Sequence, residues 1–141
     1  MRWFVDTSVL IPVFEPGHVH HERSFKLFAT ADRKSSGCAV HSLAEVYATL
    51  TRLPGIHRAS AEHALRFLEA IENRFSLVAL DVGEHRSTIG EAAGLGIVGG
   101  TTYDALIGAC ARKMKAEIIY TWNIAHFLRL GEEVAERVRT P

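Results

Sequence analysis

Three carboxylates in this sequence stand in otherwise apolar surroundings. Asp6 follows the apolar residues 3–5, and Glu45 and Asp104 each interrupt a largely apolar helical pattern. Carboxylates are rarely buried unless a partner compensates their charge. Because the three acids come from distant segments, one shared compensator is the simplest explanation. A hard cation that prefers oxygen ligands, most simply Mg²⁺, would fill that role.

The segments that carry these acids alternate between strand and helix patterns. We predict strands at residues 2–5, 37–40, 76–80 and 118–120. We predict helices from the first acid through residue 11, over 20–29, from 42 to 53, from 60 through 71, over 84–95 and over 102–115. Strands that alternate with helices indicate an α/β fold with a mostly parallel sheet. The length of 141 residues fits a single domain, residues 1–141.

The predicted elements bring the acids to one edge of the sheet. Asp6 follows the first strand and Asn123 follows the last, whereas Glu45 and Asp104 are expected in the first turn of a helix. In an open parallel sheet, the strand C-termini and helix N-termini share one rim, where ligands bind. We therefore expect four oxygen-bearing side chains to converge there. The positive ends of the helix dipoles would help to keep the carboxylates ionised.

Each of these positions also has a purely structural explanation. Ser42 and Glu45 have the spacing of a capping box, and Asp104 could merely complement a helix dipole. Asn123 could cap the short stretch that follows it, and residues 6–8 could form a simple turn. Four such caps that converge on one rim by chance are less expected than any one of them, so the pattern favours a site.

Two further motifs lack the context that their chemistry needs. His18, His20 and His21 cluster in a turn and a helix start, but no cysteine or spaced partner completes a tetrahedral zinc site. The glycines of residues 94–99 have the spacing of a dinucleotide-binding loop, but they follow a helix rather than a strand. We interpret this segment as a flexible connector.

The cellular setting is indicated by the cysteines and the hydrophobic pattern. Cys38 and Cys110 lie among small or apolar residues, which is typical of free, buried thiols in a reducing compartment. No apolar run approaches the roughly 20 residues that span a bilayer. The chain begins with a strand-like segment rather than a signal peptide. We therefore expect a cytoplasmic protein without membrane association.

Four motifs together resemble one known family, the PIN-domain ribonucleases, and within it the VapC-type toxins of prokaryotic toxin–antitoxin pairs. FVDTS at residues 4–8 resembles the opening strand and first acid of the family, and SLAEV at 42–46 its second acidic motif. YDALIGACA at 103–111 resembles the third, most specific motif. TWNIAHF at 121–127 resembles the closing motif, where many members carry aspartate and this chain has Asn123. The order and spacing of these motifs extend over nearly the whole chain.

The resemblance implies a three-layer α/β/α sandwich around a mostly parallel central sheet of about five strands. It also implies an Mg²⁺-dependent endoribonuclease, with Mn²⁺ as a possible substitute, that forms a homodimer and is inhibited by a small antitoxin. Asp6, Glu45 and Asp104 would take the positions of the family's acids. Thr7 or Ser8 would orient the first acid or contact the scissile phosphate.

The chemistry of the individual residues adds roles to this expectation. Glu45 is the best candidate to orient or deprotonate an attacking water, and Asn123 would be a neutral metal ligand, which leaves open whether one or two metals bind. Arg52, on the predicted helix of Glu45, and Arg112, two turns beyond Asp104, could hold RNA phosphates. Solvated or salt-bridged surface positions explain these two arginines equally well.

A protein partner is indicated by two further features. The 16 basic and 16 acidic residues give a formal net charge of zero, which lowers colloidal repulsion between molecules. Phe14, Phe25 and Phe28 cluster in the early helical region, beyond what a short helix pair needs for its own core. The resemblance implies that an apolar segment of the antitoxin binds near these residues.

Two other functions remain open from the sequence. The first is a catalytically weak PIN-like module that binds RNA or a protein, because Asn123 is neutral and the chain is not basic. The second is a phosphotransfer domain in which Asp6 is the nucleophile. Such chemistry usually needs a second acid two residues further on, where this chain has Ser8.

Overall fold

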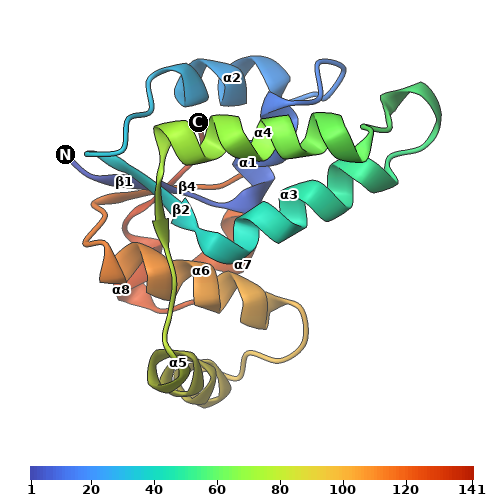
Figure 1. The fold of residues 1–141 in the computed structure, drawn as a ribbon. Helices are drawn as coiled ribbons and strands as arrows, with labels where there is room; N and C mark the ends of the chain where they lie inside the picture. The colour runs from blue at the N-terminus through green and yellow to red at the C-terminus, as the bar shows by residue number, and fades with distance from the viewer.

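A five-stranded parallel sheet forms the centre of the protein in the computed structural model, which describes residues 1–141 (Figure 1). Its strands are β1 (Trp3–Val5), β2 (Ser36–Ala39), β3 (Ser76–Val78), β4 (Ile118–Tyr120) and β5 (Val138–Arg139), in the spatial order β3-β2-β1-β4-β5. The central strand β1 pairs with β2 through Val5 and Cys38 and with β4 through Val5 and Tyr120. The predicted parallel sheet of about five strands is therefore confirmed.

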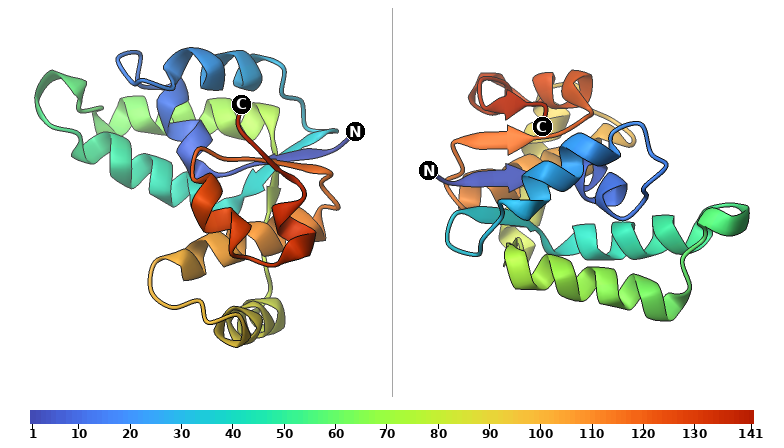
Figure 2. Two further views of the ribbon diagram at one scale, coloured as in Figure 1. Left: turned by 180° about the vertical axis from the view of Figure 1, so that it is seen from behind. Right: turned by 90° about the horizontal axis from the view of Figure 1, so that it is seen from above.

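Helices cover both faces of this sheet. They are α1 (Thr7–Val13), α2 (His21–Ala29), α3 (Val40–Arg52), α4 (Ala61–Arg74), α5 (Val82–Gly94), α6 (Thr101–Lys113), α7 (Ile124–Leu128) and α8 (Glu132–Ala135), with a 3-10 turn at Gly55–His57. Figure 2 shows α1 to α4 on one face and α6 to α8 on the other, so the three-layer α/β/α architecture is confirmed. The helix α5 packs on α6 at the outside of the molecule (Figure 1). None of the helices has the length and apolar character needed to cross a bilayer.

The core consists of two hydrophobic clusters, one on each face of the sheet. Phe4 and Val5 are neighbours on β1, and both are almost completely buried, but they belong to different clusters. Successive side chains of a strand point to opposite faces, which explains why β1 is apolar throughout. A Cβ at Gly37 on β2 would collide with the side chain of Met114, so glycine at this position lets the end of α6 approach the sheet closely.

The start of α3 is where the structure corrects the sequence prediction. The helix begins at Val40, directly after β2, and not at Ser42. Ser42 is therefore a fully buried residue inside the helix, and the predicted capping box with Glu45 is wrong. Glu45 consequently lies in the second helical turn rather than the first, whereas Asp104 does lie in the first turn of α6, as predicted.

Candidate active site

Asp6 lies at the carboxyl end of β1 and is 3% exposed. The hydroxyls of Ser8 and Thr121 both donate hydrogen bonds to its Oδ2 atom, at 2.7 and 2.9 Å. Burial raises the pKa of the Asp6 carboxyl, and these two hydrogen bonds oppose that rise. Ser8 thus orients the first acid, as the sequence predicted for Thr7 or Ser8. Asp6 occupies the N-cap position of α1 without a side-chain capping hydrogen bond, although the backbone N–H groups of Thr7 and Ser8 also act to lower the pKa of its carboxyl.

Thr7 has a different role, because it joins the starts of α1 and α3. Its hydroxyl donates a 2.8 Å hydrogen bond to Oγ of Ser42, and both residues are buried. A buried hydroxyl pair of this kind has little freedom to shift, since an unpaired hydroxyl would cost free energy. The contact therefore fixes the helix that carries Glu45 against the end of β1, where Asp6 lies.

Glu45 is the most accessible of the three acids, with a side chain that is 46% exposed. Its Oε1 lies 3.2 Å from Nε2 of His41, one turn earlier on α3. The same Nε2 atom is buried and has no well-aligned hydrogen-bond partner. The two groups are therefore close, but they are not locked together, and the Glu45 carboxylate remains available to the solvent side of the site.

Asp104 connects the three acids electrostatically. Burial, the charge of Asp6 and, as a smaller contribution, the charge of Glu45 together raise its pKa to about 6. His126 opposes this rise, since its Nδ1 lies 3.2 Å from Oδ2 of Asp104. The pKa of one acid thus depends on the charge of both others, which is expected only if they share one site.

A cavity of about 860 Å³ lies over this acidic site. Besides Glu45 and Asp104, its lining includes the side chains of Asn123, His41, His85 and His126, but no lysine or arginine. Asn123 occupies the N-cap position of α7, yet its side chain makes no capping hydrogen bond, so capping does not account for its amide. The structure therefore brings Glu45, Asp104 and Asn123 to one cavity, with Asp6 buried close by.

The two arginines that the sequence suggested as phosphate ligands lie elsewhere. Arg112 is 3.3 Å from Glu91 and 3.8 Å from Glu133, on the side of α6 that faces α5 and α8. Arg52 is exposed in the last turn of α3, about 10 Å along the helix from Glu45. Neither arginine lines the cavity. The salt-bridged surface position that the sequence left open for Arg112 is the one it adopts.

The sequence did not single out four polar residues that belong to this site. Thr121 holds Asp6, while His41 and His126 each lie beside one acid, and His85 completes the cavity wall. Two of these residues could have been identified from the sequence. Thr121 directly follows β4, just as Asp6 directly follows β1, and His41 stands four residues before Glu45, a spacing that makes helical side chains neighbours.

The donor set of the site matches a hard divalent cation in chemistry and charge. The carboxylates of Glu45 and Asp104 and the amide of Asn123 offer oxygen ligands beside three histidines. The charge of Asp6 raises the pKa of Asp104, so the site holds negative charge that no lysine or arginine compensates. No three histidine, cysteine, aspartate or glutamate side chains lie at metal-ligand spacing. Mg²⁺ does not require that arrangement, because it keeps several waters and binds through one or two carboxylates.

Sequence comparison places the chain among known proteins. A profile of the PIN domain family matches residues 3–133. Ribonuclease VapC40 of Mycobacterium tuberculosis (strain H37Rv) is 32% identical over 114 residues, which cover 81% of each chain. Ribonuclease VapC27 of the same strain is 36% identical over 117 residues, which cover 81% of this chain and 80% of that protein.

Solved structures share the fold at low sequence identity. The VapC20 toxin of Mycobacterium tuberculosis, described as cleaving the sarcin–ricin loop, superposes with a TM-score of 0.68 at 19% identity, over 86% of this chain and 89% of that one. A chain of VapBC2 from Rickettsia felis, bound to a DNA fragment from its promoter, gives a TM-score of 0.66 at 17% identity, over 99% and 98% of the two chains. At such identities the likeness concerns the fold alone.

Proposed function

The chain belongs to the PIN-domain family, alongside the VapC-type ribonucleases, and from this premise we propose that it is a metal-dependent endoribonuclease that acts as the toxin of a toxin–antitoxin pair. The observation that carries the proposal is the grouping of Asp6, Glu45 and Asp104, from three distant segments, around one cavity. The substrate class comes from the relatives, which are named as ribonucleases.

Asp6, Glu45, Asp104 and the carbonyl oxygen of Asn123 are the groups that would hold a divalent ion, Mg²⁺ or, as a substitute, Mn²⁺. Such an ion, when bound, lowers the pKa of a coordinated water and neutralises charge that develops on a phosphodiester. The cluster is suited to the ion because, without it, the carboxylates are partly buried and repel one another: burial and then the charge of Asp6 raise the pKa of Asp104.

The side chains around the proposed metal position have different roles. Glu45 is half-exposed and borders the cavity, so its carboxylate is the group that accepts a proton from the attacking water. Ser8 and Thr121 hold Oδ2 of Asp6 and keep the buried acid in one orientation. His126 lies against Asp104 and limits the rise of its pKa, which favours the ionised form that a metal needs.

Two protein contacts complete the proposal. Large apolar side chains are exposed along the length of α5 and in the loop that follows it, among them Val82, Leu95 and Val98. Exposed apolar surface of this kind is typical of association surfaces, so we assign this region to a homodimer contact. Phe25 on α2 is 51% exposed, with the ring of His21 as its aromatic neighbour, and this surface would receive the apolar segment of a small antitoxin.

A nuclease assay tests the central proposal. RNA should be cleaved with Mg²⁺ or Mn²⁺, and cleavage should stop in chelator. Glu45→Gln should lower the rate at least 100-fold, the usual scale of a lost proton acceptor, because an amide cannot take the proton of the attacking water. RNA binding without cleavage at any metal concentration would favour the catalytically weak module, to which the lack of lysine and arginine in the cavity also points.

A further inference from the structure

The cavity over the three acids, here called the acidic cavity, has no lysine or arginine that could neutralise the phosphates of an RNA backbone. Three histidines and two of the site's acids line it. RNA carries a negative charge at every phosphate, and most of the affinity of nucleic-acid-binding proteins comes from lysine and arginine contacts to phosphates. If RNA is the substrate, its phosphates must therefore be held by another part of the surface.

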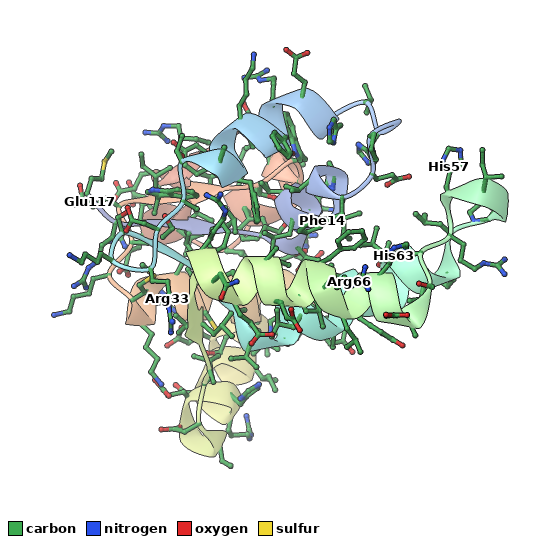
Figure 3. The ribbon with its side chains drawn as sticks, turned by 45° about the horizontal axis from the view of Figure 1, so that its top comes forward. Phe14, Arg33, His57, His63, Arg66 and Glu117 are labelled. Atoms are coloured by element: carbon green, nitrogen blue, oxygen red, sulfur yellow. The ribbon has the colours of Figure 1, made fainter.

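A strongly basic depression lies at the opposite edge of the sheet. This basic hollow, with a volume of about 610 Å³, is lined by no acidic residue and by five basic residues: Arg2, Arg33, Lys34, Lys113 and Lys115. Arg2, Lys34 and Lys115 stand just before β1, β2 and β4, and the amino ends of parallel strands share one edge. Figure 3 shows Arg33 at the end of the molecule away from His57 and His63.

Most of these positive charges have no acidic partner. Arg2, Arg33, Lys34 and Lys115 form no ion pair. The nearby carboxylate of Asp32 accepts hydrogen bonds from the backbone N–H groups of Lys34 and Ser35, at 2.9 and 3.0 Å, and so turns toward the backbone. The basic hollow is thus an unneutralised cationic surface, which fits a polyanion.

A smaller, mostly apolar depression lies between the basic hollow and the acidic cavity. This middle hollow has a volume of about 190 Å³. It shares His41, His85 and Leu106 with the acidic cavity, and it shares Val78 and Ala79 with the basic hollow. The three depressions therefore follow one another along β3, an edge strand that pairs only with β2.

One stripe of α6 forms the wall of all three depressions. Tyr103, Leu106, Cys110 and Lys113 are spaced three or four residues apart, so they lie on the same side of the helix. The rise from Asp104 to Lys113 is about 14 Å. Lys113 marks the junction with the basic hollow, where its Nζ donates to the carbonyl oxygen of Ala79 and to Glu84, at 2.8 and 2.7 Å.

We propose that an RNA strand runs from the acidic cavity along β3 and α6 and that the basic hollow binds its backbone phosphates. This inference rests on the proposed ribonuclease function and adds to it an extended, single-stranded substrate. An unstacked base would occupy the apolar middle hollow, since single strands are held by cationic grooves together with contacts to exposed bases. Arg33 and Lys34 are the residues to test, because their side chains are exposed, line the basic hollow and form no ion pair within the protein.

RNA binding in chelator, where no cleavage occurs, measures this contact directly. For a labelled single-stranded oligonucleotide, we expect Arg33→Gln/Lys34→Gln to raise the Kd about tenfold in fluorescence anisotropy. The slope of log K against log salt should become shallower by about 1.4, since each lost phosphate contact removes about 0.7 for single strands. The matched control is Lys26→Gln/Arg66→Gln, which removes the same charge from exposed positions on α2 and α4 and should bind RNA as the wild type does.

The possible outcomes separate this inference from the function on which it rests. Equal losses in the two double variants would reveal a net-charge effect and overturn the basic hollow as a site. Unchanged RNA affinity, with a loss of antitoxin affinity instead, would overturn the RNA assignment but leave the nuclease intact. A wild-type protein that neither binds nor cleaves RNA would negate the proposed function, and the inference with it.

Discussion

The hydroxyl of Thr121 donates a 2.9 Å hydrogen bond to Oδ2 of Asp6, although 115 positions separate the two residues in sequence. Both side chains are buried, and they stand at the carboxyl ends of the adjacent strands β4 and β1. Thr121 Oγ1 also accepts a 2.9 Å hydrogen bond from the backbone N–H of Asn123. One hydroxyl therefore sets the orientation of the first acid and the path of the chain into the closing motif.

Replacing this hydroxyl by a methyl group should weaken both contacts. We expect Thr121→Val to lower the free energy of unfolding by about 1–3 kcal/mol, because Oδ2 of the buried Asp6 loses one of its two hydroxyl donors and the N–H of Asn123 loses its acceptor. Metal affinity should fall as well, because Asp6 loses a donor that favours its ionised form. Chemical denaturation and metal titration measure the two effects. Thr51→Val, which removes a hydroxyl bonded to the Tyr47 carbonyl far from the site, should change stability only. Equal metal affinity in both variants would contradict the role of Thr121.

The raised pKa of Asp104 predicts how stability depends on pH in the absence of metal. Its pKa is about 6 in the folded protein, mainly through burial and then through the charge of Asp6, whereas the ordinary pKa of an aspartate in an unfolded chain is 3.8. Between these values the folded state binds more protons, so the contribution of this group to stability declines as pH rises from about 4 to about 6. Above that window, the ionised carboxylate destabilises the apo fold.

Asp104→Asn should therefore stabilise the metal-free protein while it abolishes cleavage. We expect a gain of about 1 kcal/mol at pH 7.5, discounted for partial solvation, and almost none near pH 4. Urea denaturation in chelator at both pH values gives the comparison. Glu69→Gln, at an exposed position of α4, is the control and should show no such pH-dependent gain. A variant that fails to fold would instead assign Asp104 a structural role at the helix terminus.

The sequence predicted the parts of this protein that follow from local patterns. The buried run before Asp6 predicted β1, the residues Ile118–Tyr120 were predicted as a strand and form β4, and Ser60 caps α4 as expected. The convergence of the acids followed from one general rule, that strand ends and helix starts of a parallel sheet share an edge. That rule needs only the order of the elements and none of their contacts.

The remaining features depend on contacts between distant segments. The helix α3 begins before Ser42, and the hydroxyl of this serine pairs with Thr7, which belongs to another element. The strand β5 has only two residues, too few for a periodic pattern. Arg112 turns away from the site toward Glu91 and Glu133, and sequence spacing from Asp104 cannot reveal such partners.

The proposed homodimer gives a prediction about the exposed apolar side chains near α5. Val98 is 80% exposed in the loop before α6, and Val82 is 87% exposed at the start of α5. We expect the wild type to be a dimer at micromolar concentration in light scattering. Val98→Asp should weaken the dimer at least tenfold, because a charge would be buried in the contact. Ile56→Asp, at a residue 96% exposed in the 3-10 turn, should leave the mass unchanged. A monomeric wild type would refute the dimer.

The final prediction concerns Asn123, where the resemblance of the closing motif to the PIN-domain family led us to expect an aspartate and the chain has an amide. Its side chain borders the acidic cavity and makes no capping hydrogen bond. Asn123→Asp would add a further negative charge beside the acids, and a higher ligand charge raises affinity for a hard cation. We therefore expect tighter Mg²⁺ and Mn²⁺ binding in calorimetric titrations. The melting temperature in chelator should fall, because the new carboxylate is repelled when no metal is bound.

Asn73→Asp provides the matched control for this experiment, because it makes the same chemical change at an exposed position of α4. It should alter neither the metal affinity nor the melting temperature in chelator by more than the small effect of a surface charge. If Asn123 serves only at the start of α7, aspartate would cap that helix about as well as asparagine. Metal dissociation constants that are equal for the wild type and Asn123→Asp would then remove Asn123 from the metal site and leave coordination to the three acids.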